Sequence, residues 1–198
     1  YGLNPLKDRS LKKIKILDVG CGGGLISEPM AKLGAQIEGI DADVDSIKIA
    51  KEHARKENLK IKYTNENLDM LIADNFRKFD VIFALEVLEH VDYPDDFLSK
   101  IASLTEENGL VFVSSINKNI KSLLLAKYLA EYVLNWVPRG THDWNKFINP
   151  SDLEKMMFKN SFELISCKGI IFNPMALSWK IGKDTSINYI MAFKHGSI

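Results

Sequence analysis

Short apolar runs alternate along this chain with longer stretches in which apolar residues recur every three or four positions. Apolar runs of about four to eight residues, bounded by turn residues, are typical of buried strands. They predict strands at about 14–19, 36–40, 61–64, 79–85 and 110–115. The longer stretches have the spacing of amphipathic helices. We expect those helices at about 25–33, 45–57, 94–104 and 149–159.

Strands that alternate with helices at this rhythm predict an α/β fold with a doubly wound, mostly parallel sheet of seven strands. The last two strands, at about 162–167 and 189–194, are joined without a long helix and predict an antiparallel edge. A chain of 198 residues is long enough for a single core, so we expect one domain over 1–198. Residues 117–147 follow the fifth strand as a helical insertion, which we expect to form a lid facing the substrate or a membrane.

The composition of the chain argues against some classes of function. The formal net charge is zero and 46% of residues are hydrophobic, which argues against a nucleic-acid-binding surface. Two cysteines, Cys21 and Cys167, make no disulfide framework, so a reducing compartment is expected. No signal peptide is visible in the sequence, and we expect no membrane-spanning helix because no apolar run is long enough to span a bilayer. Because Tyr1 is not a methionine, we expect the natural chain to begin further upstream.

A glycine-rich loop follows the first strand. Gly20, Gly22 and Gly24 let the backbone turn sharply and approach a ligand closely. The dinucleotide-binding pattern G-x-G-x-x-G fails because Leu25 stands at its third glycine. Asp18, two residues before the loop, suits a ligand that carries an ammonium group. The pattern D-x-G-x-G-x-G resembles motif I of S-adenosylmethionine-dependent methyltransferases, which implies that the acid lies near the methionine end of that cofactor.

Polar residues also follow the next strands. Asp41 ends the second strand, where a carboxylate can accept hydrogen bonds from ribose hydroxyls. The alternative is a helix cap, since Asp43 and Asp45 lie in the same turn. Three residues after the third strand either bracket an adenine ring or are ordinary polar loop residues: Asn65, Glu66 and Asn67. Ligands of such sheets bind at the carboxyl ends of the strands, and four polar residues share that edge: Asp18, Asp41, Asn65 and Glu86.

Glu86, Glu89 and His90 follow the fourth strand with the spacing of one helical turn, which would place all three on one face. Such a cluster could bind a divalent metal ion or deprotonate a substrate hydroxyl. Two carboxylates suit Mg²⁺, whereas histidine better suits softer metals. The alternative is a turn that packs against the cofactor and holds no metal.

The insertion carries a helical pattern over 120–137 with apolar residues on most of its circumference. An apolar face that wide is buried on two sides, paired with a partner, or placed against lipid. With three polar residues in its interior, we expect the helix to lie on a membrane rather than to span it. His142, in the turn that follows, is a candidate general base, or else a structural or solvated histidine.

Over nearly its whole length the chain resembles the ubiquinone-biosynthesis O-methyltransferases, which methylate polyprenylated phenols and catechols. The resemblance lies in L-D-V-G-C-G-G-G at 17–24, E-V-L-E-H-V at 86–91, N-K-N at 117–119, V-P-R-G-T-H-D at 137–143 and N-Y at 188–189. It implies a Rossmann-like methyltransferase fold and cofactor contacts at Gly20–Gly22, Asp41 and Leu85. It also implies Mg²⁺ at Glu86, Glu89 and His90, and an upstream arginine that contacts the cofactor on a segment this chain lacks.

The expected reaction is transfer of a sulfonium methyl group to a phenolic oxygen, with S-adenosylmethionine as the cofactor. Candidate catalytic residues are Glu89, His90 and His142; candidate cofactor-binding residues are Asp18, Gly20, Gly22, Asp41, Asn67 and Leu85. The expected partners are a lipophilic quinol precursor, a membrane surface and other quinone-biosynthesis enzymes, but no nucleic acid. The resemblance therefore implies a cytoplasmic protein at the periphery of the inner membrane.

Other functions remain open. The chain could methylate a soluble small molecule or a carbon atom, although the apolar insertion argues against a soluble substrate. It could instead be a non-catalytic cofactor-binding subunit whose insertion docks on a protein. A nicotinamide-dependent oxidoreductase fits least, because the third glycine of its fingerprint is missing.

Overall fold

The computed structural model describes residues 11–74, 77–118, 146–173 and 178–196. They fall into two compact units. The first contains the chain up to Ala84 together with Lys100–Val111, and the second contains Leu85–Ser99 together with the chain from Phe112 onward. Whether the chain behaves as one domain, as its sequence predicts, stays a prediction.

The first unit is built on parallel strands. These are β1 (Lys15–Val19), β2 (Gln36–Ile40), β3 (Lys62–Thr64) and β4 (Phe79–Leu85), in the order β3-β2-β1-β4. The next strand of the sheet after β4 is β5 (Thr105–Ile116). In the register of the sheet, Val19 pairs with Ile40 and Ile40 pairs with Thr64. The carboxyl ends of β1, β2 and β3 are therefore neighbours, as the sequence predicts for the residues that follow them.

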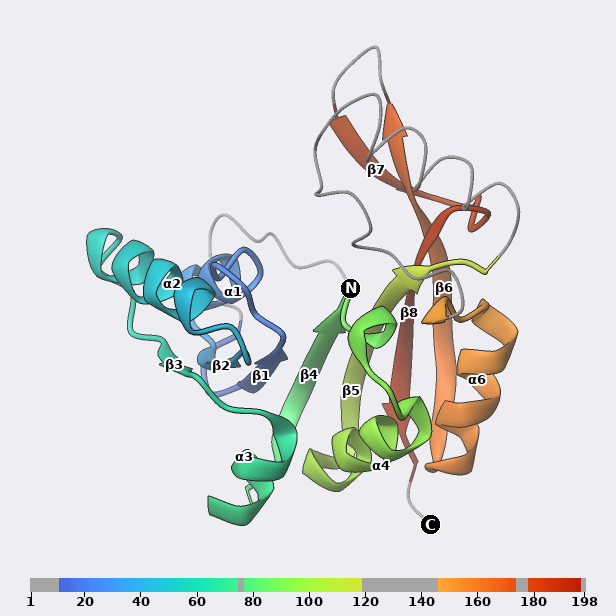
Figure 1. Cartoon of the computed structure of the whole chain (residues 1–198), viewed down its shortest axis with the longest axis horizontal. Helices are drawn as coiled ribbons and strands as arrows, with labels where there is room; N and C mark the ends of the chain where they lie inside the picture. The colour runs from blue at the N-terminus through green and yellow to red at the C-terminus, as the bar shows by residue number, and fades with distance from the viewer. Residues whose placement is uncertain (1–10, 75–76, 119–145, 174–177, 197–198) are drawn as a thin grey trace. The chain divides into compact units, whose positions relative to one another are not determined.

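Two helices pack beside these strands. The first helix, α1 (Ser27–Lys32), contacts β2, and α2 (Val44–Lys56) contacts β3 (Figure 1). Asp43 caps α2 by accepting hydrogen bonds from the backbone N–H groups of Asp45 and Ser46. The core beneath α2 consists of Cys21, Ile47, Ala50, Ala54 and Tyr63. A short helix, α3 (Leu68–Asp74), precedes β4.

The second unit is built on antiparallel strands. They are β6 (Phe162–Asn173), β7 (Ser178–Gly182) and β8 (Asn188–His195), in the order β5-β8-β6-β7 beside β5 (Thr105–Ile116). The helix α6 (Pro150–Lys159) contacts β6 and β8, and Asn149 caps it. The short 3-10 helix η1 (Leu88–His90) and α4 (Pro94–Leu104) follow β4 in the chain.

The predicted α/β fold with its parallel core and antiparallel edge is confirmed, but the sheet formed by the described residues has eight strands rather than the predicted seven. The additional strand is β7, whose residues are nearly all exposed, so it lacks the apolar run that marks the other strands. Most of the predicted insertion, including the helix at 120–137 and His142, lies outside the described residues. Within the described ranges, none of the helices has both the length and the apolar character needed to cross a bilayer.

Candidate active site

The glycine loop is fixed to the end of β2. The backbone N–H groups of Gly20 and Cys21 both donate to the carbonyl oxygen of Ile40, over 2.9 and 3.1 Å. Gly22 and Gly24 have φ angles of 50° and 89°, in the left-handed region that favours glycine. The sharp backbone turn that the sequence predicts here is therefore present, and two hydrogen bonds attach it to the end of β2.

Two glycines of the motif, Gly22 and Gly24, have different surroundings in the structure. A Cβ atom added at Gly22 would meet no described protein atom within 4 Å, so the loop is open on that side. A Cβ atom added at Gly24 would collide with the hydroxyl group of Tyr63 and lie 3.1 Å from its Cζ atom. Gly22 therefore leaves room for a ligand, whereas Gly24 is required by packing inside the protein.

Asp41 joins the glycine loop to the turn after β2. Its Oδ2 atom accepts a hydrogen bond from the Gly22 N–H over 2.8 Å, and its Oδ1 atom accepts one from the Asp43 N–H over 2.8 Å. The alternative role of Asp41 as the helix cap is wrong, because Asp43 caps α2. A carboxylate has about four lone-pair positions, so Asp41 keeps acceptor capacity for ribose hydroxyls. The ribose contact itself stays a prediction.

The polar residues after β3 mainly shape loops. Asn65 donates through its Nδ2 atom to the carbonyl oxygens of Asp41 and Ala42, over 2.8 and 2.9 Å, and so braces the loop that carries Asp41. Asn67 accepts a hydrogen bond from the Met70 N–H over 3.0 Å and thereby caps α3. Asn67 remains a predicted cofactor contact, with its side-chain oxygen used by the helix.

Asp18 is only 3% exposed. The hydroxyl group of Ser27 donates to its Oδ2 atom over 2.6 Å. Burial raises the pKa of Asp18 from 3.8 to about 6, while the hydrogen bonds from Ser27 lower it and the charge of Asp41 raises it further. The predicted contact between Asp18 and a ligand ammonium group stays a prediction, and a cation there would favour the ionised form.

Leu85 ends β4 and Glu86 follows it directly in the second unit. Glu86 has a φ angle of 54°, which is uncommon for a residue with a side chain. Its N–H donates to the carbonyl oxygen of Ser114 over 3.2 Å and to the Ser114 Oγ atom over 3.0 Å. The Ser114 hydroxyl in turn donates to Glu86 Oε1 over 2.6 Å. Ser114 therefore holds both the backbone and the carboxylate of Glu86.

Glu89 lies next to this pair and is only 4% exposed. The buried hydroxyl of Ser115 donates to Glu89 Oε2 over 3.1 Å. Burial raises the pKa of Glu89, and hydrogen bonds involving its own backbone, Ser115 and Glu86 oppose that effect. The buried ring of Tyr189 also lies in this region. Burial is the main cause that raises the pKa of Tyr189, and the charges of Glu89 and Glu86 raise it further.

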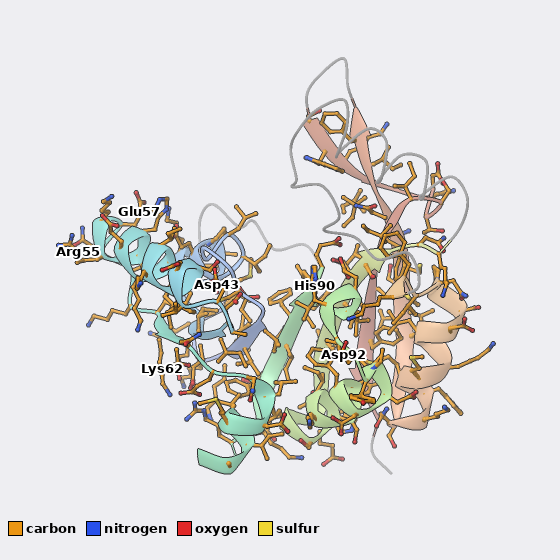
Figure 2. All side chains as sticks on the ribbon, in the orientation of Figure 1. Asp43, Arg55, Glu57, Lys62, His90 and Asp92 are labelled. Carbon is orange, nitrogen blue, oxygen red and sulfur yellow. The ribbon has the colours of Figure 1, made fainter. Side chains whose placement is uncertain are left out.

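His90 does not join the two glutamates. The expected helical turn from Glu86 to His90 is not formed, because Glu86 is left-handed and η1 contains only Leu88–His90. Successive residues of a 3-10 helix point about 120° apart. Accordingly, Glu89 is buried, whereas His90, which is labelled in Figure 2, is exposed. Among the described residues, no three His, Cys, Asp or Glu side chains are gathered closely enough to hold a metal ion.

Sequence reasoning missed the hydroxyl-bearing residues that hold the carboxylates. Ser27 holds Asp18, Ser114 holds Glu86 and Ser115 holds Glu89. Ser114 and Ser115 lie near the carboxyl end of β5, so the strand-end rule that indicated Asp18 and Asp41 would also have found them. Ser27 is the first residue of α1, and no pattern in the sequence indicated that it would contact Asp18.

Comparison with known proteins finds similar methyltransferases over most of the chain. A family model described as a methyltransferase domain matches residues 2–167. A ubiquinone biosynthesis O-methyltransferase of Pelagibacter ubique is 47% identical over 94% of this chain and 77% of its own length. One of Azorhizobium caulinodans is 44% identical over 98% of this chain and 76% of its own length.

A solved structure supports the fold. Magnesium protoporphyrin IX methyltransferase from Synechocystis PCC 6803, solved with bound SAH, superposes with a TM-score of 0.68 at 20% identity. The match covers 94% of this chain and 75% of that protein, and it identifies the fold as that of S-adenosylmethionine-dependent methyltransferases. By its matching domain and by its identity to these relatives, the chain belongs to the methyltransferase-domain family and, within it, to the ubiquinone biosynthesis O-methyltransferases.

Proposed function

We propose that this protein is an S-adenosylmethionine-dependent O-methyltransferase of ubiquinone biosynthesis, acting on a hydroxyl group of a quinol-type precursor. The observation that carries this proposal is the identity to relatives with that name over nearly the whole chain. The glycine loop, the buried Glu89 and the neighbouring exposed Glu86 support the proposal, because they offer a place for the cofactor and carboxylates for the chemistry.

The cofactor would bind at the carboxyl ends of β1 and β2. The open side of Gly22 leaves room for it, and Asp41 offers a carboxylate beside that space. When bound, S-adenosylmethionine supplies a methyl group on a positively charged sulfur. The protein contributes a fixed loop, so the cofactor meets a preformed surface and less binding free energy is lost to ordering the chain.

For oxygen methylation, the substrate hydroxyl must lose its proton while an O–C bond forms and the S–C bond of the cofactor breaks. His90 is a reasonable proton acceptor, since it is exposed whereas the neighbouring Glu89 is buried. A neutral imidazole can accept a proton from a substrate hydroxyl. His142, outside the described residues, is the alternative base.

We further propose that Glu86 and Glu89 hold Mg²⁺. Two carboxylates at the end of one strand match the hard oxygen ligands that this ion prefers, and a bound cation would lower the pKa of a coordinated substrate hydroxyl. His90 would have to turn toward the pair to be a third ligand. Electron paramagnetic resonance of Mn²⁺ titrated into the protein tests this assignment without measuring activity: Glu86→Gln should weaken binding at least tenfold, and equal binding by both proteins contradicts it.

The lipophilic character of the substrate leads to a proposal about the membrane. We propose that the apolar segment 120–137 lies on a bilayer surface, where a polyprenylated quinol precursor resides. In vesicle flotation, Leu124→Glu/Leu125→Glu should lose most of the bound fraction while keeping cofactor affinity. A variant that folds, binds cofactor and floats like the wild type contradicts the proposal.

Cofactor binding and turnover together test the proposed function. Calorimetry should detect S-adenosylmethionine binding, and the protein should methylate a short-chain demethylubiquinol. A non-catalytic subunit would bind the cofactor but yield no product, whereas a methyltransferase for soluble substrates would prefer tail-free catechols. Either result overturns the proposal.

A further inference from the structure

A pocket lies in the first unit at the amino ends of its strands, whereas the proposed cofactor site lies at their carboxyl ends. The volume of the pocket is about 610 Å³ and its lining includes Lys15, Gln36, Lys62 and Phe79, which are the first residues of β1, β2, β3 and β4. We call it the strand-start pocket. Asp18 and Asp41 stand at the other ends of β1 and β2. The strand-start pocket is therefore separate from the proposed cofactor site.

The strand-start pocket concentrates positive charge. Five basic residues line it against one acidic residue, Glu38; the basic residues are Lys15, Lys60, Lys62, Arg77 and Lys78. The whole chain carries equal numbers of basic and acidic residues, 26 of each, so this excess is local. A concave surface lined by one sign of charge focuses its potential and attracts ions of the opposite sign.

Most of this charge is not neutralised within the protein. Glu38 pairs with Lys62 over 3.2 Å (Lys62 is labelled in Figure 2) and also with Arg77. Lys15, Lys60 and Lys78 make no ion pair with any residue of the described ranges. The Nε atom of Arg77 is buried and finds no hydrogen-bond acceptor in the described part of the chain. Lys15, Lys60 and Lys78 therefore leave positive charge available to a ligand, and Arg77 keeps one N–H without an acceptor among the described residues.

We propose that the strand-start pocket binds a ligand that carries phosphate groups. Arginine and lysine together recognise phosphate, arginine through its planar N–H donors and lysine as a point charge. A multiply charged phosphate matches the excess of cations better than a single carboxylate does. The volume lies in the range of small-molecule sites, and the buried Ala35, Ile37 and Phe79 give it an apolar wall. Both a soluble phosphate compound and a phospholipid headgroup have this chemistry.

Calorimetric titration of the full chain with pyrophosphate, in the presence and absence of S-adenosylmethionine, tests the proposal. Lys60→Glu/Lys78→Glu should weaken pyrophosphate binding at least tenfold and leave cofactor affinity unchanged. The control Lys51→Glu/Lys168→Glu makes the same change in net charge at two exposed lysines that do not line the pocket, and it should bind pyrophosphate like the wild type. If the charge-reversed variant does not fold, Lys60→Gln/Lys78→Gln takes its place with the same expected direction.

Sedimentation with vesicles distinguishes the two sources of phosphate. Binding to phosphatidylglycerol vesicles that depends on Lys60 and Lys78, and that pyrophosphate displaces, identifies a lipid headgroup as the ligand. Pyrophosphate binding without such vesicle binding identifies a soluble phosphate compound. The proposal is overturned if Lys60→Glu/Lys78→Glu matches the wild type with both probes, or if the wild type binds neither. Because cofactor affinity is measured in every case, a failure here is distinguishable from failure of the proposed methyltransferase function.

Discussion

Asp41 serves two loops at once, since its carboxylate accepts the N–H groups of Gly22 and Asp43. We expect Asp41→Ala to weaken S-adenosylmethionine binding by about 1–3 kcal/mol, because the loop loses its anchor and the ribose hydroxyls lose their acceptor. Calorimetry measures the change. Asp45→Ala, at an exposed residue of the same turn, is the control and should bind normally. Unchanged affinity in Asp41→Ala would remove this residue from the site.

Asp18 makes the stability of the protein depend on pH. Its pKa rises from 3.8 to about 6 on folding, so its contribution to stability is fully present below pH 3.8 and is lost as the pH rises through about 6. Each pKa unit corresponds to about 1.4 kcal/mol, so the loss is on the order of 3 kcal/mol. We expect the wild type to lose stability relative to Asp18→Asn between pH 4 and 7, as measured by urea unfolding. A difference that stays constant with pH contradicts this.

Ser114 holds Glu86 in its uncommon backbone conformation. We expect Ser114→Ala to lower turnover by roughly tenfold, consistent with about 1.5 kcal/mol for a lost hydrogen bond to a charged group, with cofactor affinity unchanged. Ser103→Ala removes a similar hydroxyl that bonds to the Lys100 carbonyl oxygen within α4, and it should keep full turnover. Steady-state kinetics separate the two variants. Equal rates would show that Ser114 does not position Glu86 for the reaction.

At the scale of elements, the ring of Tyr63 connects β3, β2 and the glycine loop. Tyr63 pairs with Gly39 in the sheet, and a Cβ atom added at Gly39 would lie 2.6 and 2.7 Å from its Cδ1 and Cε1 atoms. The hydroxyl end of the ring contacts Gly24 in the loop. One buried side chain therefore sets the spacing of three segments, two of which lead to proposed cofactor residues.

This packing predicts strong coupling between Gly39 and Tyr63. Gly39→Ala should cost about 1–3 kcal/mol of unfolding free energy, the usual cost of overpacking. In the Tyr63→Leu background the same substitution should cost less than half as much, because the ring atoms are gone. Chemical unfolding of the two single variants and the double variant measures the coupling. Effects that add within about 0.5 kcal/mol contradict the proposed contact.

The same elements show why some predictions succeeded. The strand β2 (Gln36–Ile40) was predicted residue for residue, because Gly34 and Asp41 bound a short apolar run. The helix α4 (Pro94–Leu104) was also predicted with its observed bounds, from its initial proline and acidic first turn. The missed strand β7 and missed helix α3 are short and depend on neighbours that local sequence does not reveal.

The site was predicted less completely than the fold. Strand-end carboxylates such as Asp18 and Asp41 follow from the geometry of parallel sheets. The exposed position of His90 could not be predicted, because a 3-10 turn at Leu88–His90, preceded by the left-handed conformation of Glu86, replaces the expected helical turn. That conformation is stabilised by Ser114, which lies 28 residues further along the chain. Such long-range contacts leave no local pattern.

At the scale of the whole molecule, the two halves of the proposed chemistry belong to different units. The cofactor residues Asp18, Gly22 and Asp41 belong to the first unit, and the glutamate pair belongs to the second. The chain passes from one unit to the other three times: between Ala84 and Leu85 in β4, between Ser99 and Lys100 in α4, and between Val111 and Phe112 in β5. The account therefore predicts that a variant of the second unit can lose methyl transfer while it keeps cofactor affinity.

The most direct test follows the methyl group itself. The protein is incubated with S-adenosylmethionine carrying a ¹³C-methyl group and with reduced short-chain demethylubiquinol, and the product is examined by mass spectrometry and NMR. The account predicts one labelled methyl group on a ring oxygen, formed by the wild type and at least tenfold more slowly by Glu89→Gln with unchanged cofactor affinity. A label on a ring carbon, or no labelled product above the protein-free control, would contradict it.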